Sequence, residues 1–385
     1  MGVMAAVVVA GSGDGLIDLR VYLVGGEAWL RGVRLYAEGF PRPLEGPALP
    51  FTYPPLAAVL FSGLAVLPWS VAVLLWTGSG LFLLTAVCLV GARQVCGPGV
   101  RAVVVGTGLA CGALLLEPVR STLSFGQINL LLLGVVALDC LSPRPRWPRG
   151  LLIGFAAAIK LTPLVFVLFF LPRKQVKPVL TALASFAGFG LVGFVAAPTD
   201  TLQYWFESLL DPGRVGGLAY VSNQSLRGFL SRLSLPEAVG SALWAVLALG
   251  VVVLVWSAVR RAGENRVAAL LAVAVGGLLI SPVSWSHHWV WVVPGLLLGI
   301  GRHRWWAAGA AVLFAVAPLW WMPSSSDAEL SWSWWQHVVG NSYGLAGVVL
   351  LVALALRRVD PVVPVEPAAP VVPDRPAVAD VGAVE

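Results

Sequence analysis

Asp18 is the residue whose type and position in this chain best suit chemistry. It stands in the polar stretch 14–53, just outside an apolar segment, in a sequence that is 58% hydrophobic. Ionisable groups are costly beside hydrocarbon and are kept there mostly for function. We therefore predict that Asp18 is a base that takes a proton from a hydroxyl group. Its position alone fits equally well a cap for the helix that follows it.

Other polar side chains gather at breaks between apolar runs. They are Tyr22, Tyr53, Glu117, Arg120, Gln127, Asn129, Asn223, Gln224, His287 and His288. Structural readings compete with functional ones, because Glu117 and Arg120 could pair on one helical turn and amides often join neighbouring helices. The two histidines could anchor the chain at the membrane interface. As a metal pair they are poor, since neighbours on a helix point about 100° apart.

Lys160 lies inside the apolar run 151–171, in the segment Ala158-Ile159-Lys160-Leu161-Thr162-Pro163. An ammonium group among apolar residues needs a partner or an anionic ligand. Lysine and proline also interrupt the run near its middle. We therefore expect a re-entrant or broken helix near Lys160; the alternative is a single pass, which would invert the N-terminal half of the chain.

The composition identifies the class of protein. Charged residues make up only 11% of the 385 residues, whereas they make up about a quarter of soluble domains. A spanning helix needs about 20 mostly apolar residues, so the chain could hold roughly ten to twelve spans. The net charge of +6 does not indicate a nucleic-acid partner, because lysine and arginine stand in short loops between apolar runs. We expect an all-α, polytopic integral membrane protein.

The apolar runs show no strand alternation. They lie at about 54–68, 69–91, 101–117, 127–141, 151–171, 178–197, 238–259, 266–280, 286–300, 305–322 and 341–356. The first of them is expected to lie near the outer interface without crossing. Residues 18–36 before it predict amphipathic helical pieces on the membrane surface.

The loops predict an orientation. Loops 142–150, 172–178 and 260–266 are basic, whereas loop 323–340 has no lysine or arginine. The positive-inside rule places the basic loops in the cytoplasm. The loops expected outside, on the face of Asp18, are 14–53, 117–127, 198–237, 281–287 and 323–340.

One membrane domain, 1–357, is expected, followed by a disordered, proline-rich cytoplasmic tail at 358–385. The apolar start, 1–10, is too short to span a bilayer and lacks the basic residues of a signal peptide. Either a misassigned start truncates the first helix, which we favour, or this helix enters the membrane only partway.

Several kinds of chemistry are excluded. The sequence has no glycine-rich phosphate loop, no paired aspartates for a nucleotide–metal complex, and no evident nucleophile with its base. The cysteines lie in or beside apolar runs without metal-ligand spacing, so buried free thiols are expected. The residues require no metal or cofactor, and a lipid-borne substrate fits them best.

Five segments occur here in an order typical of one enzyme family. They are Asp18-Leu19-Arg20-Val21-Tyr22, Tyr53-Pro54-Pro55-Leu56, Phe125-Gly126-Gln127-Ile128-Asn129, Ile159-Lys160-Leu161-Thr162-Pro163 and Ser281-Pro282-Val283-Ser284-Trp285-Ser286-His287-His288. From about residue 16 to 356 the chain resembles the actinobacterial polyprenol-phosphate-mannose-dependent α-(1→2)-mannosyltransferases of glycosyltransferase family 87, which have the GT-C fold. The family pattern has aspartate where this chain has Ser286, so a second acid is missing here.

The resemblance implies transfer of mannose from polyprenyl-phosphate-mannose to a glycolipid or lipoglycan hydroxyl, on the outer face of the plasma membrane. Asp18 would be the base. The leaving phosphate needs a cation rather than an acid. Arg120 is the best placed outer cation, with His287 or His288 assisting. Lys160 could either hold the helix break or reach the lipid phosphate.

The remaining candidates would stack on the sugar or orient hydroxyl groups of the substrates. They are Tyr22, Tyr53, Glu117, Gln127, Asn129, Asn223 and Gln224. The donor could carry arabinose or glucose instead of mannose. A transporter or flippase with Lys160 at a midplane site is a rival prediction, which the lack of a visible internal repeat disfavours. An inactive scaffold is a third alternative.

Overall fold

The computed structural model describes residues 15–38, 40–41, 49–211, 214, 216–299, 304–324 and 327–356. The apolar start at 1–10 and the tail at 358–385 lie outside these residues. The described chain contains helices and no strand, so the predicted all-α class is confirmed.

The elements follow the predicted apolar runs closely. The α-helices are α2 (Ile17–Leu30), α3 (Pro55–Ala65), α4 (Trp69–Cys96), α5 (Val100–Ala113), α6 (Glu117–Phe125), α7 (Asn129–Leu141), α8 (Leu151–Ile159), α9 (Val176–Ala196), α10 (Pro198–Phe206), α11 (Leu226–Ser231), α12 (Glu237–Arg261), α13 (Arg266–Ile280), α14 (Val292–Leu296), α15 (Arg304–Val316), α16 (Trp334–Gly340) and α17 (Ser342–Leu356). The 3-10 helices are η1 (Thr162–Phe169), η2 (Leu171–Arg173), η3 (Ser208–Leu210), η5 (Ser286–Trp291), η6 (Leu297–Gly299), η7 (Pro318–Trp321) and η8 (Ala328–Ser331).

Among the described residues, α4, α9 and α12 are long and apolar enough to cross a membrane. Two pairs of helices are bent at a short break: α5 with α6, by 65°, and α16 with α17, by 71°. Each pair adds one candidate span if its two helices are counted together. The other apolar helices are shorter than 18 residues. The predicted runs are therefore present, but several are broken into pieces. The protein is a polytopic helical bundle.

The break at Lys160 is confirmed. Helix α8 ends at Ile159, and Lys160 has extended backbone angles (φ −145°, ψ 123°). Pro163 has no N–H group and disfavours helical geometry at the residue before it, so the chain resumes as the 3-10 helix η1. The side chain of Lys160 thus projects from a gap between two apolar helices.

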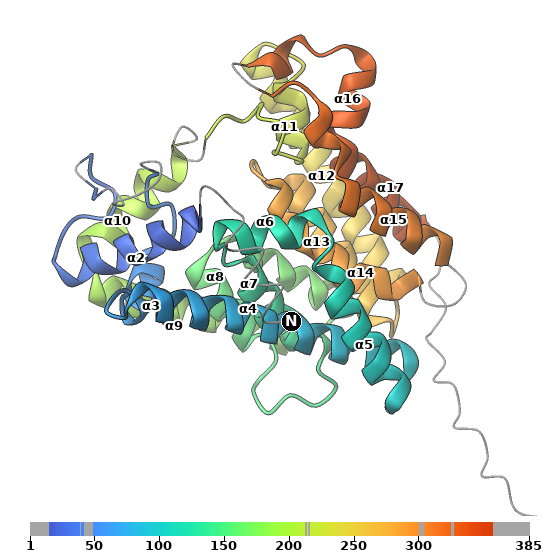
Figure 1. Ribbon diagram of the computed structural model, residues 1–385, viewed down its shortest axis with the longest axis horizontal. Helices are drawn as coiled ribbons and strands as arrows, with labels where there is room; N and C mark the ends of the chain where they lie inside the picture. Colours follow the sequence, from blue (N-terminus) through green and yellow to red (C-terminus); the bar gives the residue numbers. More distant parts are fainter. Residues whose placement is uncertain are drawn as a thin grey trace, which may run out of the picture.

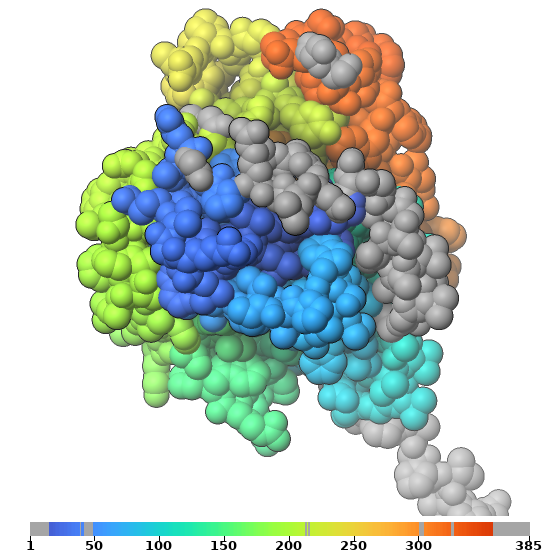
Figure 2. Space-filling model, turned by 60° about the vertical axis from the view of Figure 1, so that its left-hand side comes forward, coloured from blue at the N-terminus to red at the C-terminus, as the bar shows by residue number. Residues whose placement is uncertain are grey.

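Helix α2 is held by partners that lie close by and partners that lie far away along the chain. It packs along α3, where an added Cβ on Gly26 would lie 2.6 Å from the Ser62 nitrogen, so the two backbones touch. The Trp29 Nε1 donates a hydrogen bond to the carbonyl of Ala196 at the end of α9. Figure 2 shows α2 in blue against the lime-green segment of α9 and α10.

The bundle has two distinct polar ends. At one end the basic loops 142–150, 172–178 and 260–266 meet. Arg266 donates to the Ser142 carbonyl (3.1 Å), and Arg173 donates to the Gly263 carbonyl (3.0 Å). At the other end α11 and α16 lie side by side, with α12 and α17 running from them along the bundle (Figure 1). The grouping of the basic loops on one face thus agrees with the prediction from their charges.

Gly154 sets the spacing of α8 and α9. A Cβ at this buried position would lie 2.2 Å from the carbonyl oxygen of Ala182, which is backbone and cannot rotate away. We expect Gly154→Ala to destabilise the protein by about 1–3 kcal/mol through overpacking. A lower melting temperature of the detergent-solubilised protein would report this loss.

Gly188→Ala is the matched control, because a Cβ at Gly188 on α9 meets nothing within 4 Å. Alanine favours the helix more than glycine does, so this variant should melt at the same or a higher temperature. Equal melting temperatures for the two variants would contradict the close packing at Gly154.

Candidate functional site

The turn between α6 and α7 brings Asp18 to its neighbours. Gly126 ends α6 in the left-handed region (φ 67°), and a Cβ there would lie 2.7 Å from the Cβ of Leu19. Only glycine fits both the backbone angle and this close approach. The Leu16 N–H donates to the Ser124 carbonyl (3.0 Å), which starts α2 directly beside the turn.

Asp18 lies in the first turn of α2 and does not cap it. The N-cap residue is Leu16, and no side chain supplies a capping hydrogen bond. The capping alternative is therefore wrong, and the carboxylate of Asp18 is engaged elsewhere. It accepts a hydrogen bond from Gln127 and lies within electrostatic range of Lys160. Burial raises the pKa of Asp18 to about 6, and the Gln127 hydrogen bond and the Lys160 charge oppose that rise.

Gln127 is oriented by two tyrosines. The Tyr22 hydroxyl donates to the Gln127 Oε1 (3.0 Å) and lies 2.8 Å from the Tyr53 hydroxyl. A hydroxyl has one proton, so a Tyr22 that donates to Gln127 accepts from Tyr53. With its oxygen thus occupied, the amide presents its N–H groups to Asp18.

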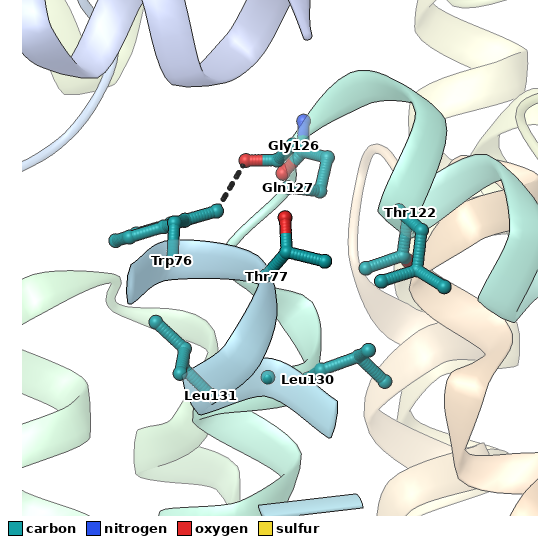
Figure 3. A pocket seen from close by; sticks show the side chains of 9 residues that line it. Trp76, Thr77, Thr122, Gly126, Gln127, Leu130 and Leu131 are labelled. Carbon is teal, nitrogen blue, oxygen red and sulfur yellow. Dashed lines mark hydrogen bonds between the residues drawn. The ribbon is translucent and has the colours of Figure 1, made fainter. Parts of the chain in front are cut away.

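A small cavity lies beneath the same turn. It measures about 10 Å³ and is lined by residues of α4, α6 and α7, including Thr77, Thr122 and Leu130. Figure 3 shows Trp76 of α4 reaching the Gly126 carbonyl, to which its Nε1 donates at 2.8 Å. This bond ties the turn to α4, the longest helix of the described chain.

Lys160 completes the group around Asp18. Its Nζ lies 3.4 Å from the His288 Nε2 and 5.4 Å from the centre of the Tyr53 ring, over its face. Both contacts are with side chains, so the lysine is not used to cap the broken helix ends. A cation thus sits between the predicted base and a histidine.

The histidine pair is held through its backbone. The His287 carbonyl accepts from the Asn129 Nδ2 and the Thr122 Oγ1, each at 3.0 Å. The His287 ring is buried between Phe125 and His288, and neither of its nitrogens has a hydrogen-bond partner among the described residues. The two imidazole planes stand at 90°. Their centres lie only 4.8 Å apart, so the rings meet edge to face instead of pointing apart as predicted. The part of the chain that is described holds no cluster of three potential metal ligands.

Glu117 and Arg120 do not form the predicted pair. The Glu117 carboxylate is buried and accepts hydrogen bonds from Ser121, Ser286, Trp320 and Tyr343. Arg120 is exposed on α6 and donates to the carbonyl of Ala315 (3.2 Å). The two side chains separate because hydrogen-bond donors from three other elements, the Ser286 and Tyr343 hydroxyls and the Trp320 indole N–H, converge on Glu117.

Asn223 and Gln224 are buried and bonded to backbone. Asn223 donates to the carbonyls of Leu218 and Pro282 and accepts from the Ser284 N–H (3.0 Å). Gln224 donates to the Gly340 carbonyl (2.7 Å) and accepts from the Tyr343 N–H, across the bend between α16 and α17. Neither amide lies with the Asp18 group. Asn223 fastens its loop to the segment 282–284, and Gln224 fastens it to the bend between α16 and α17.

The structure thus gathers Asp18, Tyr22, Tyr53, Gln127, Lys160 and His288, with His287 and Asn129 beside them. It leaves Arg120, Glu117, Asn223 and Gln224 in other networks. Sequence reasoning missed Thr122 and Trp76, which anchor the site, and Tyr343, which donates to Glu117. Thr122 lies within the polar break 117–129 and could have been included, whereas Trp76 lies in an apolar run and gives no such signal.

Cysteine placement is close to the prediction. Cys88, Cys96 and Cys140 are buried and carry free thiols. Cys111 also has a free thiol but is exposed on α5, because this face of the helix packs against no other part of the described chain.

Comparison with known proteins gives one family. The family model described as glycosyltransferase family 87 matches residues 51–282. A polyprenol-phosphate-mannose-dependent α-(1→2)-phosphatidylinositol mannoside mannosyltransferase of Mycobacterium tuberculosis is 40% identical over 363 residues, which cover 88% of this chain and 84% of that protein. A protein of the same name from Mycolicibacterium smegmatis is 38% identical over 370 residues, covering 88% of this chain and 83% of its own.

A further relative has a more specific name. The polyprenol-phosphate-mannose-dependent α-(1→2)-phosphatidylinositol pentamannoside mannosyltransferase of Mycobacterium tuberculosis is 33% identical over 369 residues, covering 89% of this chain and 80% of that protein. No solved structure matches the chain.

Proposed function

Since this chain belongs to glycosyltransferase family 87, we propose that it transfers mannose from polyprenyl-phosphate-mannose to a phosphatidylinositol mannoside, forming an α-(1→2) linkage. The names of the relatives support the donor and the acceptor class. The membrane helices, and the basic loops that meet at one end of the bundle and that the positive-inside rule assigns to the cytoplasm, support an active site at the outer face of the plasma membrane.

One observation carries the proposal. The Asp18 carboxylate is held by Gln127 in electrostatic range of Lys160, and Lys160 touches His288. A base and a cation are thus paired where α6 and α8 end. Glycosyl transfer from a lipid phosphate requires this combination, because the acceptor hydroxyl must lose a proton while a charged phosphate departs.

The reaction then divides between these residues. The acceptor oxygen attacks the anomeric carbon of the mannosyl group, and Asp18 takes the hydroxyl proton. The bond between that carbon and the phosphate oxygen breaks, and both of its electrons stay with the phosphate. Lys160, with His288 beside it, stabilises the departing polyprenyl phosphate, so no proton donor is needed there.

Arg120 has a lesser part in this proposal than its charge suggested. Its guanidinium is bound to the Ala315 carbonyl on α15, away from the Asp18 group. Lys160 replaces it as the cation for the donor phosphate. Tyr22, Tyr53 and Gln127 hold Asp18, and Asn129 holds the histidine segment.

Removing the base tests the proposal directly. Asp18→Asn keeps the size of the side chain and its contact with Gln127 but cannot accept the proton. We expect transfer of mannose to fall by at least about 100-fold, the usual contribution of a general base. The measurement is product formation by purified protein supplied with polyprenyl-phosphate-mannose and phosphatidylinositol mannoside.

Glu27→Gln is the control for this variant, because Glu27 lies on the same helix but pairs with Arg31 at the exposed surface. It should transfer mannose at the rate of the unaltered protein. Full activity of Asp18→Asn would refute the assignment of the base. Transfer of arabinose or glucose but not mannose from their lipid phosphates would refute the donor.

The raised pKa of Asp18 predicts a pH dependence. A base works only when ionised, so kcat/KM should fall about tenfold per pH unit once the pH drops below about 6. The Gln127 hydrogen bond lowers this pKa, so Gln127→Leu should move the acid limb to higher pH. An acid limb near the ordinary aspartate value, or a shift to lower pH in Gln127→Leu, would contradict the burial of this carboxylate.

A further inference from the structure

Glu117 has an unusual environment for a buried carboxylate. Its Oε1 accepts from the Ser121 Oγ (2.8 Å), the Ser286 Oγ (2.8 Å) and the Trp320 Nε1 (3.2 Å), and its Oε2 accepts from the Tyr343 hydroxyl (3.1 Å). The side chain is only 5% exposed. Among the described residues no lysine or arginine forms an ion pair with it. Neutral donors alone therefore satisfy this carboxylate.

These donors come from separate elements. Ser121 follows Glu117 on α6, whereas Ser286 begins η5, Trp320 belongs to η7, and Tyr343 lies in the first turn of α17. Bonds to an ionised acceptor are stronger than bonds between neutral groups. Glu117 thus joins four elements of the chain, α6, η5, η7 and α17.

The bond to Ser286 is the one that leads to the Asp18 group. The Ser286 N–H also donates to the Ser222 Oγ (3.1 Å), and the next residue, His287, has its carbonyl fixed by Thr122 and Asn129. The backbone at 286–287 is thus held on both sides. His288 follows immediately, and its Nε2 contacts the Nζ of Lys160.

We infer that Glu117 is a positioning residue that, through Ser286, holds His288 against Lys160. This inference rests on the proposed function, in which Lys160 and His288 receive the donor phosphate. Glu117 touches none of the reacting groups. Its contribution is to keep the histidine segment from turning away when the phosphate group enters or leaves.

Two hydroxyl deletions separate positioning from general stability. Ser286→Ala and Tyr343→Phe each remove one donor from Glu117, but only Ser286 lies on η5 with His288, and Tyr343→Phe keeps the ring that packs on Trp289 of that helix. We expect Ser286→Ala to raise the KM for polyprenyl-phosphate-mannose, and the Kd for polyprenyl phosphate alone, at least fivefold. Tyr343→Phe should leave both constants within twofold of the unaltered protein. Its melting temperature should nevertheless fall at least as far as that of Ser286→Ala.

Ser286→Thr restores a hydroxyl at the same place and should recover most of the donor binding. A double-mutant cycle supplies the link to Glu117. Glu117→Leu alone should weaken donor binding. Added to Ser286→Ala, it should weaken binding little further, because the effects of residues that act through one another are not additive. Where Glu117→Leu fails to fold, the comparison of Ser286→Ala with Tyr343→Phe decides.

The inference is overturned if Ser286→Ala binds polyprenyl phosphate normally, if Tyr343→Phe weakens binding to the same degree, or if the cycle is additive. Failure of the proposed function looks different. In that case the unaltered protein transfers no mannose from polyprenyl-phosphate-mannose, whatever the variants do.

Discussion

The sharp turn at Gly126 is the constraint on which the candidate site depends. It ends α6, starts α7 three residues later, and brings Leu19 of α2 within contact of the backbone. The buried Gly126 carbonyl must find a donor, because an unpaired backbone group in an apolar bundle is costly. Trp76 supplies it and thereby fixes the turn to α4. Asp18 and Gln127 meet because each lies close to this turn, one on either side of it.

The same rule explains why the polar residues collect where helices are interrupted. A helix satisfies its own backbone, so an apolar helix needs no polar side chain along its length. At the breaks near Gly126 and Ser284, free N–H and C=O groups require partners, and neighbouring side chains supply them. Thr122, Asn129 and Asn223 serve the backbone in this way. The helix breaks, which need polar side chains for structure, are therefore also the places where polar side chains for chemistry can be kept in an apolar bundle.

The sequence predicts some of these features well and others poorly. The apolar runs predict the helices, and Lys160 with Pro163 predicts the break. Both signals are local, because they act on the backbone of neighbouring residues. Helix α6 was missed, since its polar sequence reads as a loop although Pro118 fits its first turn and Gly126 ends it. The amides at 223 and 224 look suited to a substrate. The partners of Gln224, Gly340 and Tyr343, lie more than 100 residues away, and no local pattern reveals them.

The long-range anchoring of α2 has a consequence for synthesis. Trp29 bonds to Ala196 and Arg34 to Asp200, partners that follow 167 and 166 residues later. At roughly 5–20 residues per second, a ribosome needs on the order of ten to thirty seconds to make that intervening chain. The segment bearing Asp18 is therefore made first and docked late. The helices between them are therefore made before the segment bearing Asp18 has these two partners.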